Sequence, residues 1–434
     1  MKNIIRSRFL ITTVFLVSAV IFFGVAYAET FIDDTEPEFG AGTYLNTAWN
    51  IDHIELSSGQ TSGTFTSQVF DAGEEVNWSN IQWSENVTSI DKLIIVDASA
   101  DVWKSTDSGA TWTLVKDDYN DTAGNDADDM AADSNGNFFI LHNQDVWQSI
   151  DSGATWTKVS DNYNGSESQD GIRIASDTNN NLYIAEGDED IWQSIDSGAT
   201  FTKQAANMNE GNGNIRGFFA IGADLYAVDG SADVWKSTDS GATWTLVKDD
   251  YNDTAGNDAD DMAADSNGNF FILHNQDVWQ SIDSGATWTK VSDNYNGSES
   301  QDGIRIASDT NNNLYIAEGD EDIWQSIDSG ATFTKQAANM NEGNGNTKGM
   351  FFVRVSTNIV FSARSSGTNP PTDVFTGAFS DPLGQEPDVS SARYFQYQAT
   401  LNSEDSSLTP ELLNVSVTWL PIPDTTAPGA VADL

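Results

Sequence analysis

The sequence predicts an all-β protein built on a β-propeller of four-stranded antiparallel blades. The first observation is a repeat: every residue from Ser99 to Asn214 recurs 132 positions later, from Ser231 to Asn346. The second is a finer period, because one short phrase occurs three times in each copy, at intervals of 43 to 45 residues. A fixed period of this length is typical of folds in which each unit buries its apolar face against its neighbours.

The third observation is the pattern inside one unit, which has strand-type segments and no helical spacing. Four such segments are Ile172–Ser176, Leu182–Ala185, Asp190–Ser194 and Phe201–Gln204. Asn, Asp, Ser and Gly residues separate them, as in tight turns between strands. Four antiparallel strands in about 44 residues form one blade of a propeller.

The number of blades follows from the number of units. Six units carry the repeated phrase, and a seventh without it is read in Gly349–Arg354, Asn358–Ser362 and Asp373–Gly377. The sequence therefore predicts seven blades, with six as the alternative. The first unit lacks a first strand of its own, so we expect it to borrow one from Ile81–Val87.

The repeated phrase reads Ser105-Thr-Asp107-Ser-Gly109-Ala-Thr111-Trp112 in its first copy. Short acidic side chains accept hydrogen bonds from the amides of their own turn, and glycine adopts backbone angles that other residues resist. The phrase resembles the Asp-box of sialidase-type (BNR) propellers, in which the boxes are structural and lie away from the central cavity. The expected structural residues are Asp107, Gly109, Trp112, Asp151, Asp196, Asp239, Asp283 and Asp328.

A tryptophan also recurs once per unit, two positions after an aspartate. One large aromatic residue at one position per blade suits packing between blades, and this is the favoured interpretation. Stacking on a sugar ring is the alternative. The residues are Trp103, Trp147, Trp192, Trp235, Trp279 and Trp324.

The segments on either side of the repeats differ in character. Thr64–Gly73, Asn77–Trp83, Arg393–Thr400 and Leu412–Trp419 resemble the outer strands of a small β-sandwich of exported bacterial and archaeal proteins. The propeller is then inserted in, or flanked by, this sandwich. The tail resembles the start of a fibronectin type III domain, which implies a longer multidomain chain. The expected boundaries are 1–28 for a signal peptide, 29–88 and 381–420 for the two sandwich halves, 89–380 for the propeller and 421–434 for the linker and tail.

The N-terminus and the charge predict an exported protein. Lys2, Arg6 and Arg8 precede an apolar run, Phe9–Phe23, and small residues follow at Ala26 and Ala28, as in a secretory signal peptide. No membrane insertion is expected after its cleavage, with an uncleaved N-terminal anchor as the alternative, and the expected location is secreted or cell-surface (extracellular or periplasmic). The formal charge of −47 disfavours nucleic acid as a partner. The chain has no cysteine, which excludes disulfides and thiolate metal sites.

Acidic turns raise the question of metal binding. The turns Asp133–Asn137 and Asp177–Asn181 resemble the start of a calcium loop but lack the glutamate that would complete an EF-hand. The acidic runs Asp126–Asp129 and Glu186–Asp190 are interpreted as solvated loops. No metal or other cofactor is predicted, with calcium at weak affinity left open.

Sialidase chemistry requires three arginines, a tyrosine nucleophile with a glutamate partner, and an acid. The candidates Tyr183 and Glu186 are close in sequence but recur as Tyr315 and Glu318 in an identical local setting. A propeller active site is built once, by blades that differ. No catalytic residue is therefore assigned, and the sequence favours a non-enzyme.

The functional prediction is a secreted, non-catalytic propeller that binds a polysaccharide or an extracellular protein, or serves as a scaffold. The alternatives are a sialidase-like glycoside hydrolase that uses the central cavity, and a cell-envelope assembly factor.

Overall fold

The computed structural model describes residues 28–120, 127–165, 169–205, 208, 214–252, 259–297, 301–337, 340 and 346–423. Three predicted features lie outside these residues: the signal peptide up to residue 27, Asp126 of the first acidic run, and the fibronectin-like tail from Asp424. Within them, no helix has the length and apolarity needed to span a bilayer. The chain divides into two compact units: unit 1 is Met1–Ile90 with Val355–Leu434, and unit 2 is Asp91–Arg354.

Five four-stranded sheets make up most of unit 2, and in each sheet the strands pair antiparallel in chain order. The first three are β10 (Asp129–Ala132), β11 (Phe138–His142), β12 (Asp145–Ser149) and β13 (Thr157–Ser160); β14 (Gly171–Ser176), β15 (Leu182–Glu186), β16 (Ile191–Ser194) and β17 (Thr202–Ala205); β18 (Ile215–Ile221), β19 (Asp224–Asp229), β20 (Val234–Ser237) and β21 (Thr245–Lys248). The other two are β22 (Asp261–Ala264), β23 (Phe270–His274), β24 (Asp277–Ser281) and β25 (Thr289–Ser292); β26 (Gly303–Ser308), β27 (Leu314–Glu318), β28 (Ile323–Ser326) and β29 (Thr334–Ala337).

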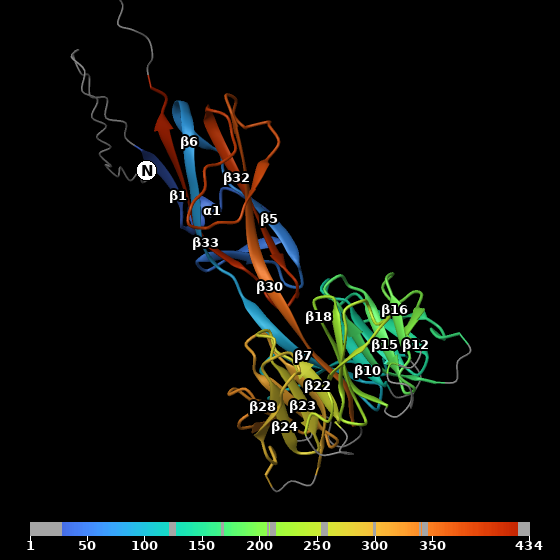
Figure 1. Cartoon of the computed structure of the whole chain (residues 1–434). Helices are drawn as coiled ribbons and strands as arrows, with labels where there is room; N and C mark the ends of the chain where they lie inside the picture. Colours follow the sequence, from blue (N-terminus) through green and yellow to red (C-terminus); the bar gives the residue numbers. More distant parts are fainter. Residues whose placement is uncertain are drawn as a thin grey trace, which may run out of the picture. The chain divides into compact units, whose positions relative to one another are not determined.

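Apolar side chains join each sheet to the next. Phe139 and Leu141 of β11 pack with Ile174 of β14 and Leu182 and Ile184 of β15, and all five are buried. The first strands of consecutive sheets lie side by side, from β10 to β26. Each sheet thus buries both faces against neighbours, which is the packing of a β-propeller with four-stranded blades (Figure 1).

The predicted count of seven blades, or six, is wrong, because the described chain forms five separate four-stranded sheets. The strands around the first copy of the repeated phrase are β7 (Ser89–Asp97), β8 (Val102–Ser105) and β9 (Thr113–Lys116), and they pair in the order β30-β7-β8-β9 within a larger 13-stranded sheet. The segment expected to form a seventh blade is instead one unbroken strand, β30 (Thr347–Ser366). It has no turn between Arg354 and Asn358, so it cannot fold back into a blade.

The ring is closed by β7 together with the first part of β30. Leu93 and Ile95 of β7 and Met350 of β30 pack against Tyr315 and Ile323 of the last sheet. On the opposite face, Ile94 and Val96 pack against Met130 and Ile140 of the first. The first strand that the first unit borrows is therefore Thr347–Arg354. It is not Ile81–Val87, because that part of the chain belongs to β6 and pairs with β33. Unit 2 ends at Arg354, short of the predicted limit of 380, because β30 continues into unit 1.

Unit 1 combines strands from both ends of the chain, and Figure 1 shows blue and red strands interleaved. Its long strand β6 pairs with β33 and β32, and β32 also pairs with β5 and β30. The predicted sandwich halves are thus hydrogen-bonded to each other, and their assignment as a β-sandwich stays a prediction. The elements are β1 (Glu29–Asp33), α1 (Glu36–Phe39), β2 (Thr43–Leu45), β3 (Thr47–Asn50), β4 (His53–Leu56), β5 (Ser62–Thr66), β6 (Phe70–Asn86), β31 (Thr376–Phe379), β32 (Ala392–Ser403) and β33 (Glu411–Pro421).

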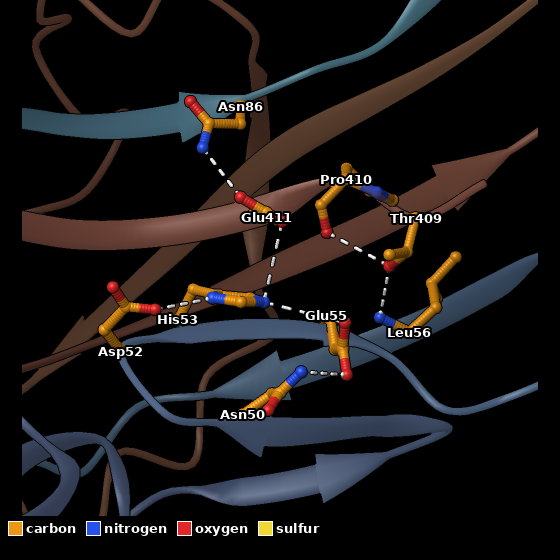
Figure 2. Close-up of polar contacts among 9 residues, drawn as sticks. All are labelled: Asn50, Asp52, His53, Glu55, Leu56, Asn86, Thr409, Pro410 and Glu411. Carbon is orange, nitrogen blue, oxygen red and sulfur yellow. Dashed lines mark hydrogen bonds and ion pairs between the residues drawn. The ribbon is translucent and has the colours of Figure 1, made fainter.

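A histidine fastens the β3–β4 hairpin of unit 1 to β33 (Figure 2). His53 Nδ1 lies 2.9 Å from Asp52 Oδ1, and Nε2 lies 3.6 Å from Glu55 and 3.7 Å from Glu411. Burial opposes the charge on His53, but the hydrogen bond to Asp52 and the charges of Glu411 and Glu55 outweigh it and raise the pKa. The carboxylates of Asp52, Glu55 and Glu411 thus favour the charged form of His53.

The duplicated sheets allow a paired test of the fold. Ile140 and Ile272 occupy equivalent positions, and both are 0% exposed. We expect Ile140→Ala and Ile272→Ala each to lower the free energy of unfolding by about 2–5 kcal/mol, because each leaves a cavity between sheets. Chemical denaturation monitored by tryptophan fluorescence measures the effect. Ile150→Ala, at a residue that is 76% exposed, is the matched control, and a loss equal to that of the buried pair would contradict the packing described.

Candidate functional site

Each copy of the repeated phrase, here called a box, forms the turn between the third and fourth strands of a sheet. In the first box, Asp107 accepts hydrogen bonds from Thr111 N (2.8 Å), Thr111 Oγ1 (2.6 Å) and Ser105 Oγ (2.9 Å). Gly109 has a φ of 86° and donates its N–H to Ser105 Oγ, while the Trp112 indole donates to Gly109 O. The same aspartate bonds recur in the other boxes, at Asp151, Asp196, Asp239, Asp283 and Asp328. The carboxylate of each box is thus used inside its own turn.

These bonds also set the charge of the box aspartates. Slight burial raises the pKa of Asp107, but the hydrogen bonds from Thr111 and Ser105 outweigh it and lower the pKa overall. Asp107 is therefore ionised at neutral and mildly acidic pH, and it serves as an acceptor.

The recurring tryptophans lie at the third strand of each sheet, and four of them sit between a tyrosine and a lysine. Trp147 contacts the ring of Tyr119 edge-on at 5.9 Å, and Lys158 Nζ lies 5.4 Å from its centroid. Trp192, Trp279 and Trp324 have the same two neighbours. Trp103 and Trp235 instead donate their indole N–H to Asp97 and Asp229. All six indoles thus contact side chains of the propeller itself, and the choice between packing and ligand stacking stays a prediction.

Four charged side chains meet where the first strands of the sheets converge. Arg173 of β14 donates to Asp260 O at 3.1 Å, and its Nε lies 3.8 Å from Asp261 Oδ1 of β22. Arg305 of β26 donates to Asp128 O at 3.0 Å, and its Nε lies 3.9 Å from Asp129 Oδ1 of β10. We call Asp129, Arg173, Asp261 and Arg305 the axial cluster.

The axial cluster fills the centre of the propeller. The neighbours of β14 in the ring are β10 and β18, so Arg173 reaches β22 only by crossing the space that the first strands enclose. All four side chains are at most 12% exposed. Burial raises the pKa of Asp129 to about 6, against the opposing effect of Arg305 and Arg173. Burial, followed by the charge of Arg173, lowers the pKa of Arg305.

A buried polar residue recurs at six hairpins between second and third strands, including that between β7 and β8. The six residues, here called the hairpin ring, are Asp97, His142, Glu186, Asp229, His274 and Glu318. Four of them bind a tyrosine that precedes their own sheet: Tyr119 Oη lies 3.0 Å from His142 Nδ1, and Tyr163 Oη donates to Glu186 at 2.9 Å. The repeat copies do the same. These bonds link each sheet to the next on one side of the propeller.

Two hairpins of this ring are strongly acidic. Glu186, Asp188 and Asp190 each place one carboxylate oxygen within 4.8 Å of the others, and Glu318, Asp320 and Asp322 repeat the arrangement. Such groups of oxygen donors are the ligands that divalent cations prefer. By contrast, Asp133 and Asp177 accept backbone and asparagine N–H bonds within their own turns.

The structure separates the residues that sialidase chemistry would need together. Tyr183 donates to Asp177 rather than to Glu186, and Arg393 pairs with Asp71 in unit 1. The tyrosine that does meet Glu186 is Tyr163, which sequence reasoning missed. Tyr163 lies 23 residues before Glu186 in the sequence. A tyrosine recurs before each hairpin that carries a buried glutamate or histidine, and this recurrence was the signal that could have found it. Burial, and then the charge of Glu186, raise the pKa of Tyr163 far above its ordinary value, the opposite of what activates a nucleophile.

A separate polar depression of about 400 Å³ lies in unit 1. Arg364, Asp373 and Asp388 line it together with serines of β30 and of the segment before β32. Arg364 is held in place there, since it donates to Gln396 Oε1 and to Asp373 O and stacks on Phe375.

No protein-family profile matches the chain, and no curated protein sequence matches it. Similar solved structures include YCF48 bound to a D1 peptide, with 16% identity over 64% of this chain and 97% of the other, at a TM-score of 0.42. A catalytically inactive virginiamycin B lyase from Staphylococcus aureus with quinupristin is 10% identical over 70% of this chain and 97% of the other, with a TM-score of 0.38. The gluconolactonase XC5397 from Xanthomonas campestris is 10% identical over 66% of this chain and 97% of the other, with a TM-score of 0.40.

The hydrogen bonds within each box predict a local effect on stability. We expect Asp107→Ala to lower the free energy of unfolding by about 1–2 kcal/mol, because it leaves the Thr111 N–H and hydroxyl without their acceptor. Asp239→Ala, in the repeat copy, should have the same effect. Thermal and urea denaturation measure both. Asp117→Ala, at an exposed carboxylate outside the box, is the control, and an equal loss there would argue against the turn's hydrogen bonds as the cause.

Burial at the centre predicts how the stability of unit 2 varies with pH. The pKa of Asp129 in the folded protein is about 6, above the ordinary 3.8. Between about pH 4 and pH 6 the folded chain therefore binds more protons than the unfolded chain. The contribution of Asp129 to the free energy of unfolding, present at about pH 4, is lost as the pH rises through 6. The box aspartates have lowered pKa values, so their contribution is lost only below about pH 4. Calorimetry should thus find the highest melting temperature near pH 4–5.

A variant separates this effect from general charge repulsion. Burial raises the pKa of Asp260 to about 6, so Asp260→Asn should reduce the fall in melting temperature between pH 5 and 7. Asp249→Asn removes the same charge at an exposed position. Equal slopes in the two variants would show that surface charge, not the buried carboxyl, sets the pH dependence.

Proposed function

We propose that the chain is a secreted, non-catalytic propeller that binds a polysaccharide or an extracellular protein, or acts as a scaffold for one. The observation that carries the proposal is the axial cluster. In a propeller enzyme, the centre is the place where different blades bring an acid, a base or a nucleophile together. Here the centre is occupied by two arginines and two aspartates that pair with one another.

The repeat supports the same proposal. Enzymes that use two carboxyl groups place them in different environments, so that one is protonated and the other ionised. Asp129 and Asp261 are copies of each other, both are buried, and burial raises the pKa of both. An acid and a base are not distinguished there. A glycoside hydrolase at the centre is the weaker candidate for this reason.

Duplication is an advantage for binding. Every residue between Ser99 and Asn214 is present again between Ser231 and Asn346. A repeating polymer or a multivalent partner that contacts one copy can contact the second at high effective concentration, which strengthens binding without any new type of contact. We therefore expect two equivalent sites per chain.

A binding and release assay tests the proposal. Residues 29–423 are incubated with a panel of polysaccharides that includes sialylated glycans, and both retained protein and new reducing ends are measured. We expect retention without release, and calorimetry with a short oligosaccharide of the retained polymer should give two sites per chain.

Release of reducing ends would contradict the proposal and support a glycoside hydrolase. If the assay shows no retention and no release, the polysaccharide is excluded as the partner. A protein partner then remains, including the role of a cell-envelope assembly factor. Heat-denatured chain is the control for non-specific retention.

A further inference from the structure

The polar depression of unit 1 is built by three segments that side-chain hydrogen bonds join together. Ser365 Oγ of β30 donates to Ser390 O at 2.6 Å, and Thr376 Oγ1 of β31 donates to Asp388 O at 2.6 Å. Strand pairing between Ala363 and Thr376 also joins β30 to β31. The shape of the depression is therefore fixed before a ligand arrives, which lowers the entropic cost of binding.

Three polar side chains of this lining are not used by the fold. The carboxylates of Asp373 and Asp388 and the hydroxyl of Ser390 form no hydrogen bond or ion pair with any residue that the structure describes. All three residues are exposed. The volume of about 400 Å³ is within the range of small-molecule sites, about 300–1,000 Å³. The depression thus offers free hydrogen-bonding groups to a small polar ligand.

Arg364 adds a positive charge in a fixed orientation. Its Nε and Nη2 donate to Gln396 Oε1 at 3.0 and 2.6 Å, its Nη1 donates to Asp373 O at 3.1 Å, and its guanidinium stacks on Phe375 at 4.4 Å. Among the described carboxylates, none forms an ion pair with Arg364. A guanidinium has five N–H groups, three of which are used here, so two remain for a ligand.

These groups select the chemical class of the ligand. A carboxylate only accepts hydrogen bonds, a guanidinium only donates them, and a hydroxyl does both. A ligand with several hydroxyl groups can therefore bond to Asp373, Asp388 and Arg364 at the same time. Both carboxylates would repel an anionic ligand, and Arg364 would repel a cationic one. In addition, Gln396 occupies the Nε–Nη2 edge of Arg364, where a carboxylate binds with two hydrogen bonds.

Val374 provides an apolar surface beside these polar groups. It lines the depression and is 82% exposed. A sugar ring has C–H groups on its faces and hydroxyls at its edge, so it can cover Val374 while its hydroxyls reach the carboxylates. We propose that the depression binds one residue of a neutral saccharide. The inference goes beyond the proposed function, which expects two equivalent sites in the repeat copies, because neither copy contains these residues.

Titration of the full chain with neutral monosaccharides tests the proposal. The probes are glucose, galactose, mannose and N-acetylglucosamine, with sialic acid as the anionic comparison and lysine as the cationic one. Equilibrium dialysis should give one site per chain for at least one of the four sugars. The dissociation constant should be on the order of 10⁻³ M, as for a small ligand in an open site. Tighter binding of sialic acid or lysine would overturn the proposal.

Two variants locate the site. Asp373→Ala and Asp388→Ala should each weaken binding of that sugar by about tenfold or more, because each removes a charged acceptor. Their melting temperatures should be unchanged, since neither carboxylate has a partner to lose. Glu386→Ala is the matched control, because it removes the same charge from an exposed position outside the depression.

Three results would contradict the assignment. These are equal weakening in the control and in the two variants, full binding by the double variant Asp373→Ala with Asp388→Ala, and no saturable binding of any of the four sugars. The first would indicate an effect of general charge, and the second would place the sugar elsewhere.

The double variant also separates this inference from the proposed function. Both substitutions lie in unit 1, so retention of a polysaccharide by the repeat copies should persist in the double variant. A chain that binds the monosaccharide but retains no polymer would contradict the proposed function alone. A chain that retains polymer while its monosaccharide binding ignores the double variant would contradict this inference alone.

Discussion

The structure depends on the burial of both faces of every sheet against its neighbours. A four-stranded antiparallel sheet of this size has two apolar faces and too few residues to cover either alone. Residues such as Leu182, Ile184 and Phe139 have no exposed surface only because the next sheet supplies their contacts. The chain has no cysteine, so no disulfide contributes. The ring must therefore close, and the closing elements, β7 and the start of β30, matter as much as any complete sheet.

Polar interactions then organise the two regions that apolar packing leaves open. In each turn between third and fourth strands, the aspartate of the repeated phrase accepts hydrogen bonds from its own turn, so six turns of similar sequence have the same geometry. Tyr163 and the equivalent tyrosines bind the hairpin of the next sheet, and the axial cluster pairs sheets that are not adjacent. The bonds within the turns are local in sequence, whereas those of the axial arginines join residues up to 177 positions apart.

This difference in range explains what the sequence could and could not predict. The strands, the four-stranded sheets and the turns between them follow from local alternation and turn residues, and these features agree with the structure. The blade count failed because Gly349–Ser362 has strand composition without revealing that it is one strand with two sets of partners.

The candidate site shows the same limit. No local pattern marks Arg173 and Arg305 as partners of Asp261 and Asp129, because that pairing arises from ring closure. The acidic character of the hairpin at Glu186 is plain in the sequence. The burial of the Glu186 carboxylate is not, because its hydrogen bonds come from the tyrosine and asparagine of the preceding loop.

The pairing of β30 with β7 also fixes an order of events during synthesis. β7 begins at Ser89 and its partner at Thr347, so more than half of the chain is made before the two can meet. Until then β7 has an open strand edge, and an open edge pairs readily with other chains. Between them the chain completes five four-stranded sheets, each of which pairs within itself. The distance along the chain between β7 and β30 thus makes the timing of synthesis, and not only final stability, a determinant of whether the ring closes within one chain.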